Sequence, residues 1–336
     1  MKPLKDTNIP YPMKLFGVIL LFFFIFIISI RFGAVEISFK NIYMALFTNQ
    51  SNEEISIIKE IRLPREIAAI FVGAALATAG AIMQGMTRNP LADPGILGLT
   101  AGANAALALT LVIIPSANYF GIMVSCFIGA AIGALFVFGI SMLNKGGFSP
   151  FKMVLAGSAV SAFLYAIAEG IGIYFKISKD VSMWTAGGII GTNWRQLYVV
   201  VPFIILGIII AVLLSRQLTI LSLKEEVAVG LGQKILRVKI ILFMVITILA
   251  GASVALVGNL AFVGLMIPHI VRAIVGTDYR FIIPMCVFIG ASFMLLADTI
   301  GRTINAPFET PVAAIVSIMG LPFFLLIVHK GGKVLP

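Results

Sequence analysis

The sequence predicts an all-α, polytopic membrane protein with about ten transmembrane helices. Composition is the first reason: 11% of the 336 residues are charged and 60% are hydrophobic, whereas an average soluble domain has about 25% charged residues. Patterning is the second reason, because the apolar residues gather in long runs with few or no charges. The whole chain, residues 1–336, is expected to form a single transmembrane domain.

The apolar runs account for about ten crossings, each of which needs about 20 residues to span the hydrocarbon. In chain order the predicted spans are 13–30, 67–86, 95–114, 119–143, 153–175, 196–215, 238–258, 260–276, 281–301 and 310–329. The first is interpreted as a retained span rather than a signal peptide, since no A-x-A-like cleavage site follows it. Two uncharged stretches are too long for one helix and are divided at turn signals, 115–118 and 258–259.

The positive charges lie mainly at the ends of the apolar runs, so the net charge of +10 indicates membrane anchoring rather than binding to nucleic acid. With the N-terminus placed in the cytoplasm, most of the 24 lysines and arginines fall on the inner side. This bias predicts that both termini are cytoplasmic. The outer side still holds more cations than topology requires, so some of them are expected to bind an acidic partner.

The sequence contains no motif for catalysis or for a resident cofactor. It lacks the G-x-x-x-x-G-K-[ST] pattern of P-loop ATPases and the H-E-x-x-H pattern of zinc proteases. Its two histidines, His269 and His329, lie far apart, and its two cysteines, Cys126 and Cys286, lie inside apolar runs. We therefore expect no enzyme activity in the chain itself, no metal site and no cofactor. A channel, a transporter and a structural membrane subunit remain.

Two polar segments interrupt the apolar pattern. The first, QGMTRNPLADPGILG at 84–98, is an elbow in which Asp93 is expected to cap the third span. Residues alone leave open whether it is an ordinary helix–helix turn or part of a mechanism. The second, 216–239, is expected to form two short helices joined at 230–232. It is either a solvated loop or a docking surface for a cytosolic partner.

Four long motifs resemble the permease subunits of bacterial ABC importers for iron-siderophore complexes, haem and cobalamin. They are RLPR at 62–65 with the stretch 73–103, WTAGGIIGTNW at 184–194, FVGLMIPHIVRAIVGTDYR at 262–280, and 295–324. The resemblance implies a permease in the bacterial cytoplasmic membrane. It also implies a second permease as homo- or heterodimer partner, two cytosolic ATPases and an extracytoplasmic binding protein. A ferric siderophore is the expected substrate, because that group is the broadest in the family; cobalamin and haem are the alternatives.

The resemblance also implies roles for particular residues. Asn89, Pro90 and Leu91 would line the cytoplasmic end of the translocation path. An E-x-A-x-x-L-G type pattern would couple the permease to the ATPase through Glu225, Glu226, Ala228, Gly230, Leu231 and Gly232. Arg62, Arg65 and Arg302 would receive acidic residues of the binding protein; from the residues alone, an interaction with lipid phosphates is the favoured interpretation.

Glu169 lies about two turns inside the fifth predicted span, where the related permeases are expected to be neutral. It either reaches the outer interface or is protonated, or it faces the path and meets a cation. Intramembrane carboxylates often mark ion paths, so Glu169 and Asp298 also support a competing class, an ion-coupled secondary transporter. The 216–239 segment argues against that class, because such a transporter needs no ATPase contact.

Overall fold

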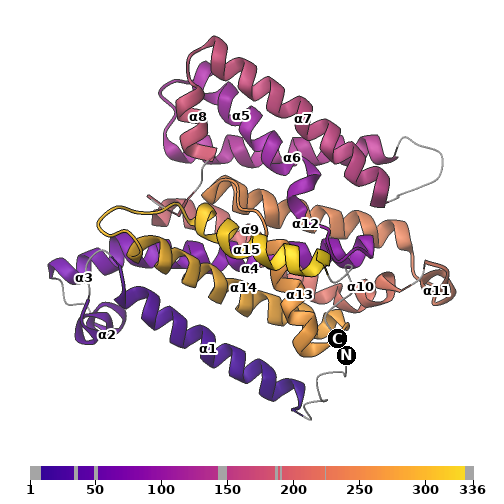
Figure 1. Ribbon diagram of the computed structural model, residues 1–336, viewed down its shortest axis with the longest axis horizontal. Helices are drawn as coiled ribbons and strands as arrows, with labels where there is room; N and C mark the ends of the chain where they lie inside the picture. The colour runs from indigo at the N-terminus through magenta and orange to yellow at the C-terminus, as the bar shows by residue number, and fades with distance from the viewer. Residues whose placement is uncertain are drawn as a thin grey trace.

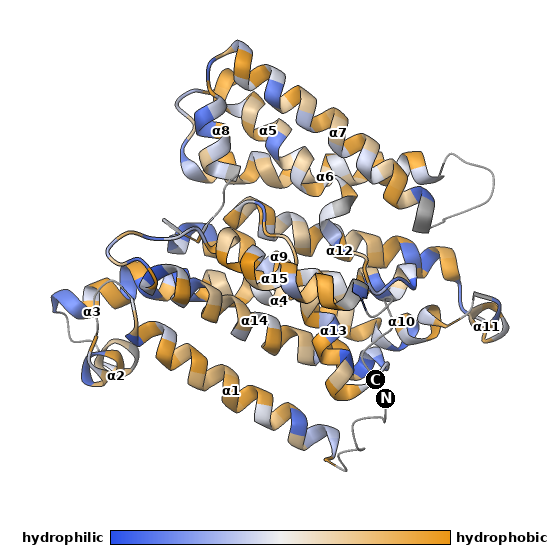
Figure 2. Ribbon diagram, viewed as in Figure 1, coloured by the Kyte–Doolittle hydropathy of each residue, from blue (hydrophilic) through white to orange (hydrophobic). Residues whose placement is uncertain are grey.

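The computed structural model describes residues 9–33, 37–48, 52–142, 150–185, 188–189, 191–223 and 225–329. Within these ranges every regular element is a helix, and the long helices lie roughly alongside one another (Figure 1). Their middles are apolar and their polar residues gather near the ends, as a lipid environment requires (Figure 2). The prediction of an all-α membrane protein is confirmed.

Each predicted span corresponds to one helix. They are α1 (Tyr11–Arg31), α4 (Leu63–Thr87), α5 (Leu99–Ile113), α6 (Tyr119–Met142), α7 (Pro150–Tyr174), α9 (Trp194–Leu213), α12 (Ile235–Val257), α13 (Val263–Val275), α14 (Tyr279–Thr303) and α15 (Val312–His329). In the described part of the chain, 7 helices are long and apolar enough to cross a membrane by length and composition, and α5, α13 and α15 are shorter apolar helices. The division at 258–259 is therefore correct.

Local chemistry sets several of the helix ends. Asn193 and Gln196 form a capping box that begins α9, and the Asp278 side chain caps α14 by accepting from the Arg280 amide. Gly258 ends α12 with φ +74°, which an L side chain rarely adopts. Asp93 accepts from the Gly95 amide at 2.7 Å, so it caps a short 3-10 helix, η2 (Pro94–Leu97). The predicted third span is corrected accordingly, because α5 itself begins only at Leu99.

The remaining short elements lie at the two ends of the bundle. One end, here called the α2 end, carries α2 (Phe39–Phe47), α3 (Glu53–Ile57), the π-helical turn η1 (Ile58–Arg62) and α8 (Ser178–Thr185). The other, the α11 end, carries α10 (Ser215–Ser222) and α11 (Glu225–Gly230). Hydropathy did not reveal α2, α3 or α8, since short helices at an interface have no spanning apolar run.

Helix α4 is the centre of the bundle and contacts α9, α12, α13 and α14. Glycines bring its backbone close to its neighbours: a Cβ on Gly80 would lie 1.8 Å from the Gly264 carbonyl oxygen of α13, and one on Gly73 would lie 2.2 Å from that of Gly290 in α14. Small residues at helix crossings are the usual basis of packing in lipid, where no hydrophobic force draws helices together. Helices α5, α6, α7 and α8 form a second group beside this core (Figure 1).

Candidate functional site

A buried cluster of charges lies at the α2 end, between α1, α4 and α14. The Arg65 guanidinium binds Asp298 at 2.9 Å and Glu309 at 2.8 Å. Arg302 binds Glu66 at 2.5 Å and approaches Asp298 at 2.9 Å. We call these residues, together with Arg62, the outer ion cluster, because the sequence predicts that this end faces the outside.

The arginines of the outer ion cluster are buried by this chain's own atoms. Arg62, Arg65 and Arg302 keep 6%, 7% and 4% of their surface exposed. Arg62 Nη1 also donates to the carbonyl oxygens of Ile30 and Arg31, at 2.5 and 3.1 Å. Without a partner chain, docking to a binding protein stays a prediction, but the described conformation turns these guanidinium groups inward. Interaction with lipid phosphates is disfavoured, because the groups do not reach the surface.

Sequence reasoning missed the acids that complete the cluster. Glu66 directly follows Arg65, is fully buried, and accepts from Ser29 Oγ at 2.5 Å. Glu309 lies in the loop after α14, and its side chain is 32% exposed. The sequence did contain a signal for Glu66, because a Glu next to an Arg at the start of a span is costly unless it is paired. The partner of each arginine was not readable, because Arg65 and Glu309 lie 244 positions apart.

The elbow between α4 and η2 lies at the α11 end. Arg88 ends α4 in the left-handed conformation, with φ 53°, and its guanidinium lies 3.5 Å from the Leu223 carbonyl oxygen. Asn89 Oδ1 accepts from the Leu91 amide at 3.0 Å, which forms a tight turn around Pro90. Arg88 and Asn89 are exposed, while Pro90 and Leu91 are half-buried. The elbow is thus a fixed structure that presents polar groups beside α10.

Two short helices occupy the 216–239 segment, as predicted, but their junction differs. Helix α10 ends at Ser222 and α11 begins at Glu225, and the glycine turn instead leads from α11 into α12. Gly232 adopts φ +75° there, so the sequence signal at 230–232 marked a helix end. Ala228 of α11 is buried, while Val229 and Leu231 are each 62% exposed. Glu226 is also exposed, and the segment therefore presents apolar and acidic groups together.

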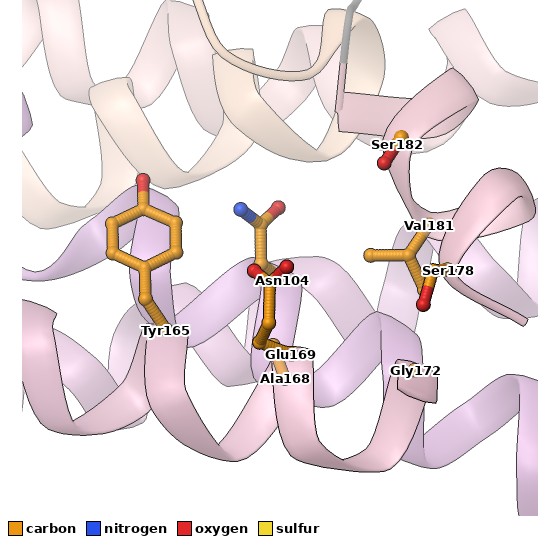
Figure 3. Close-up of a pocket in the computed structure, with 8 residues that line it drawn as sticks. All are labelled: Asn104, Tyr165, Ala168, Glu169, Gly172, Ser178, Val181 and Ser182. Atoms are coloured by element: carbon orange, nitrogen blue, oxygen red, sulfur yellow. The ribbon is translucent and has the colours of Figure 1, made fainter. Parts of the chain in front are cut away.

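Glu169 lines a pocket of about 300 Å³ between α5, α7 and α8 (Figure 3). The other lining residues are Asn104, Tyr165, Ala168, Gly172, Ser178, Val181 and Ser182. Asn104 comes from α5 and is buried, whereas Glu169 is exposed on α7. Among the described residues of α7, only Lys152 and Glu169 are charged.

The described residues contain no cluster of three or more His, Cys, Asp or Glu side chains that could hold a metal ion. His269 is buried in α13 and packs edge-on against Phe323, with ring centroids 5.8 Å apart. Cys126 and Cys286 are both buried and free. These positions act as packing residues in the described part of the chain.

A bundle of long apolar helices whose polar residues gather near the ends is the architecture of a polytopic membrane protein. The chain belongs to the FecCD transport family, whose model matches residues 20–330. It is therefore a multi-span permease subunit of an ABC importer family whose members include permeases named for iron(3+)-hydroxamate, Fe(3+)-citrate and hemin transport, and a protein of the bacterial cell membrane.

Three comparisons illustrate this membership. The chain is 42% identical to the iron(3+)-hydroxamate import system permease protein FhuB of Bacillus subtilis (strain 168), covering 90% of this chain and 79% of that protein. It is 40% identical to the Fe(3+)-citrate import system permease protein YfmD of the same organism, covering 93% of each. A solved metal-chelate type ABC transporter, described as putative and inward-facing, superposes with TM-score 0.82 at 28% identity, covering 95% of this chain and 99% of its own.

Proposed function

We propose that this permease carries ferric siderophores into the cytoplasm, and that ferric hydroxamates are its main substrate class. The observation that carries the proposal is the 42% identity to a permease named for iron(3+)-hydroxamate import. The chemistry agrees with it, because a chelated iron brings its own ligands and needs no metal cage in the protein.

The proposed assembly contains a second permease, two cytosolic ATPases and an extracytoplasmic binding protein. The α11 end would face the cytoplasm, where both termini would also lie, and the α2 end would face the binding protein. One side-chain contact at each end joins elements that would lie on the same side of the membrane. At the α11 end, Lys14 donates to the carbonyl oxygen of Ile274 at 2.8 Å. At the α2 end, Trp194 Nε1 donates to the Lys59 carbonyl at 2.9 Å.

The elbow would form part of the cytoplasmic gate. One elbow from each permease, approaching across the assembly, would narrow the path with Asn89, Pro90 and Leu91. The turn closed by Asn89 supports this role, because a gate must hold its side chains in a defined position. The contact of Arg88 with the end of α10 would link the gate to the segment that meets the ATPase.

Helix α11 and the turn after it would be the ATPase contact. Exposed apolar side chains surrounded by charges are typical of protein interfaces. Here Val229 and Leu231 supply the apolar surface, and the exposed Glu226 supplies a charge. Glu225, its neighbour in the sequence, is proposed to belong to the same contact. Ala228 and the glycines Gly230 and Gly232 would keep the surface compact, so that motion of the ATPase is transmitted to α10 and α12.

Binding-protein docking would engage the outer ion cluster from its most accessible side. Glu309 is its most exposed carboxylate, at 32% of its side-chain surface, and it occupies Nη1 of Arg65. An acid of the binding protein would replace Glu309 on Arg65, while Arg62 and Arg302 add positive potential behind it. This arrangement reconciles a docking role with the burial of the arginines.

An uptake assay tests the proposed function. A strain without its own siderophore permeases would express this chain with its partner subunits, and uptake of a ferric hydroxamate, ferric citrate, hemin and cobalamin would be compared. We expect ATP-dependent uptake of the ferric hydroxamate at the lowest concentrations. Uptake of only hemin or cobalamin would refute the siderophore proposal. Uptake that follows the proton gradient in ATP-depleted vesicles would instead support the secondary-transporter class, which the pairing of Asp298 with two arginines disfavours.

A further inference from the structure

We propose that the pocket between α5, α7 and α8 is a subsite for a positively charged arm of the transported complex, and that Glu169 is its counter-ion. The ligand class is a ferric hydroxamate with a protonated primary amine. This inference rests on the proposed function and adds a specificity determinant to it.

The position of Glu169 indicates that its side chain does not face lipid. It lies five residues before the end of α7 at Tyr174, or about 7–8 Å along the helix at about 1.5 Å per residue. A charged group at this depth is costly in hydrocarbon, and such groups nearly always face a protein interior or a water-filled cavity. The side of α7 that carries Glu169 is therefore expected to line an aqueous path.

Glu169 has no partner of its own among the described residues. No hydrogen bond or ion pair of its carboxylate is found there, although Lys179 lies on the neighbouring helix α8. The outer ion cluster behaves differently, since all of its carboxylates are paired with arginines. A structural carboxylate within a span would be expected to have such a partner. Its absence around Glu169 indicates a charge that is kept for a ligand.

The pocket lining suits one polar arm of a chelate. Around Glu169 it offers the Asn104 amide, the Tyr165 hydroxyl and the hydroxyls of Ser178 and Ser182 (Figure 3). These neutral groups accept hydrogen bonds from an ammonium or an amide without adding a competing charge. Its volume of about 300 Å³ lies at the small end of ligand pockets. It therefore fits an arm rather than the whole iron complex.

A cation on the second permease is the competing occupant, and the pocket shape argues against it. Glu169 lines a hollow whose far wall is the short helix α8, so a partner side chain would have to enter between two helices of this chain. A substrate arm that passes along the path can enter such a hollow and leave it again. The two possible occupants lead to different expected results. If a cation of the second permease binds Glu169, substitution of Glu169 should slow the uptake of every substrate.

The test compares two probes that differ by a single charge. They are a linear ferric trihydroxamate with a free primary amine and the same complex with that amine acetylated. Uptake by the full complex, with its binding protein and ATPases, is measured at limiting concentration for wild type and for Glu169→Gln. We expect the substitution to lower uptake of the amine probe about tenfold, as loss of a close charge pair would, and to leave uptake of the acetylated probe unchanged.

Two further variants complete the design. Asp180→Asn neutralises an exposed acid on α8 that does not line the pocket, and it should transport both probes like wild type. Glu169→Asp keeps the charge and should restore most of the preference for the amine probe. The binding protein is the same in every arm, so its own preference cancels.

Equal slowing of both probes by Glu169→Gln would overturn the inference and assign Glu169 to packing or to the second permease. No slowing of either probe would also overturn it. If the wild-type complex imports hemin or cobalamin but neither hydroxamate, the proposed function itself fails, and the subsite proposal fails with it.

Discussion

At the scale of single residues, the outer ion cluster is the most demanding feature of the chain. Asp298 and Glu66 are fully buried, and each would be costly at this position without a guanidinium group. Arg65 of α4 binds Asp298 of α14, and Arg302 of α14 binds Glu66 of α4. The cluster therefore locks the two helices together at the α2 end.

Asp298→Asn should destabilise the protein by about 3–5 kcal/mol, because it leaves two buried guanidinium groups short of negative charge. Glu309→Gln should cost about 1 kcal/mol or less, since that side chain is 32% exposed and exposed pairs contribute little. Thermal unfolding in detergent micelles would measure both. Equal losses for the two variants would mean that burial does not set the strength of these pairs.

Glu309→Gln should also tighten docking of the binding protein by a few fold, because it releases Nη1 of Arg65 for an incoming acid. Affinity would be measured by titrating the purified binding protein onto the permease in nanodiscs. Glu53→Gln, another exposed acid at the α2 end, serves as the control. Weaker docking by Glu309→Gln would show that Glu309 is itself a contact for the partner and that Arg65 is not the receiving group.

At the scale of elements, α4 is distinguished by its close glycine contacts and α11 by its exposed surface. Helix α4 approaches α13 and α14 through glycines, whereas α1 is mostly exposed within the single chain. Helix α11 differs from the spanning helices because it presents the exposed acid Glu226 beside exposed apolar side chains such as Val229. The packing of α4 and the exposure of α11 lead to separate predictions.

Gly80→Ala should destabilise the α4–α13 contact by about 1–3 kcal/mol, the usual cost of overpacking. The added Cβ would meet backbone of Gly264, which has no flexible side chain that can move away. Gly139→Ala in α6 is the matched control, because a Cβ there has no atom within 4 Å. The thermal unfolding midpoints of the two variants, measured in the same detergent, test this prediction. Equal midpoints would contradict close packing at Gly80.

Reversing Glu225 and Glu226 to Lys should leave the permease folded in the membrane but reduce its co-purification with the ATPase at least tenfold. The reason is that stranding a charged partner at an interface costs about 2–5 kcal/mol. The double variant Glu53→Lys with Glu60→Lys, at the opposite end, provides a matched change of charge. Normal ATPase recovery with the first double variant would exclude α11 as the contact.

At the scale of the whole molecule, the two ends of the bundle are chemically different. The α11 end combines the elbow, α10 and α11, and the α2 end combines the outer ion cluster with the short helices α2, α3 and α8 (Figures 1 and 2). The proposed assembly, with a cytosolic ATPase at one end and an extracytoplasmic binding protein at the other, would need such a difference. The sidedness itself can be tested directly.

In a chain stripped of Cys126 and Cys286, a single cysteine at Gln233 should react only with a reagent supplied from the cytoplasmic side. Single cysteines at Asn118, Lys179 and Ala306 should react from outside, because these positions lie at the α2 end. Impermeant maleimide labelling of intact cells and of inverted vesicles would measure this. Labelling of Gln233 in intact cells would reverse the orientation and remove the basis for ATPase coupling through α11.

The sequence by itself determined the class of the molecule and the positions of its spans. Long apolar runs can satisfy their backbone groups only as helices in lipid, so hydropathy located the spans, and the turn signals at 115–118 and 258–259 divided the two runs that are too long for one helix. The turn residues at 230–232 were less decisive, because glycine signals a change of direction but not which two helices it joins. The motif resemblance identified the family, which the comparisons confirmed.

Only the tertiary structure decided which side chains meet. Arg65 and Arg302 looked like free outer cations in the sequence, because Asp298 and Glu309, which bind Arg65, and Glu66, which binds Arg302, come from other helices and loops. Glu169 looked like an isolated carboxylate, and the pocket around it depends on α8, a helix too short to detect by hydropathy. The physical reason is the same in both cases: local sequence sets helix formation, whereas burial and ion pairing depend on contacts between distant segments.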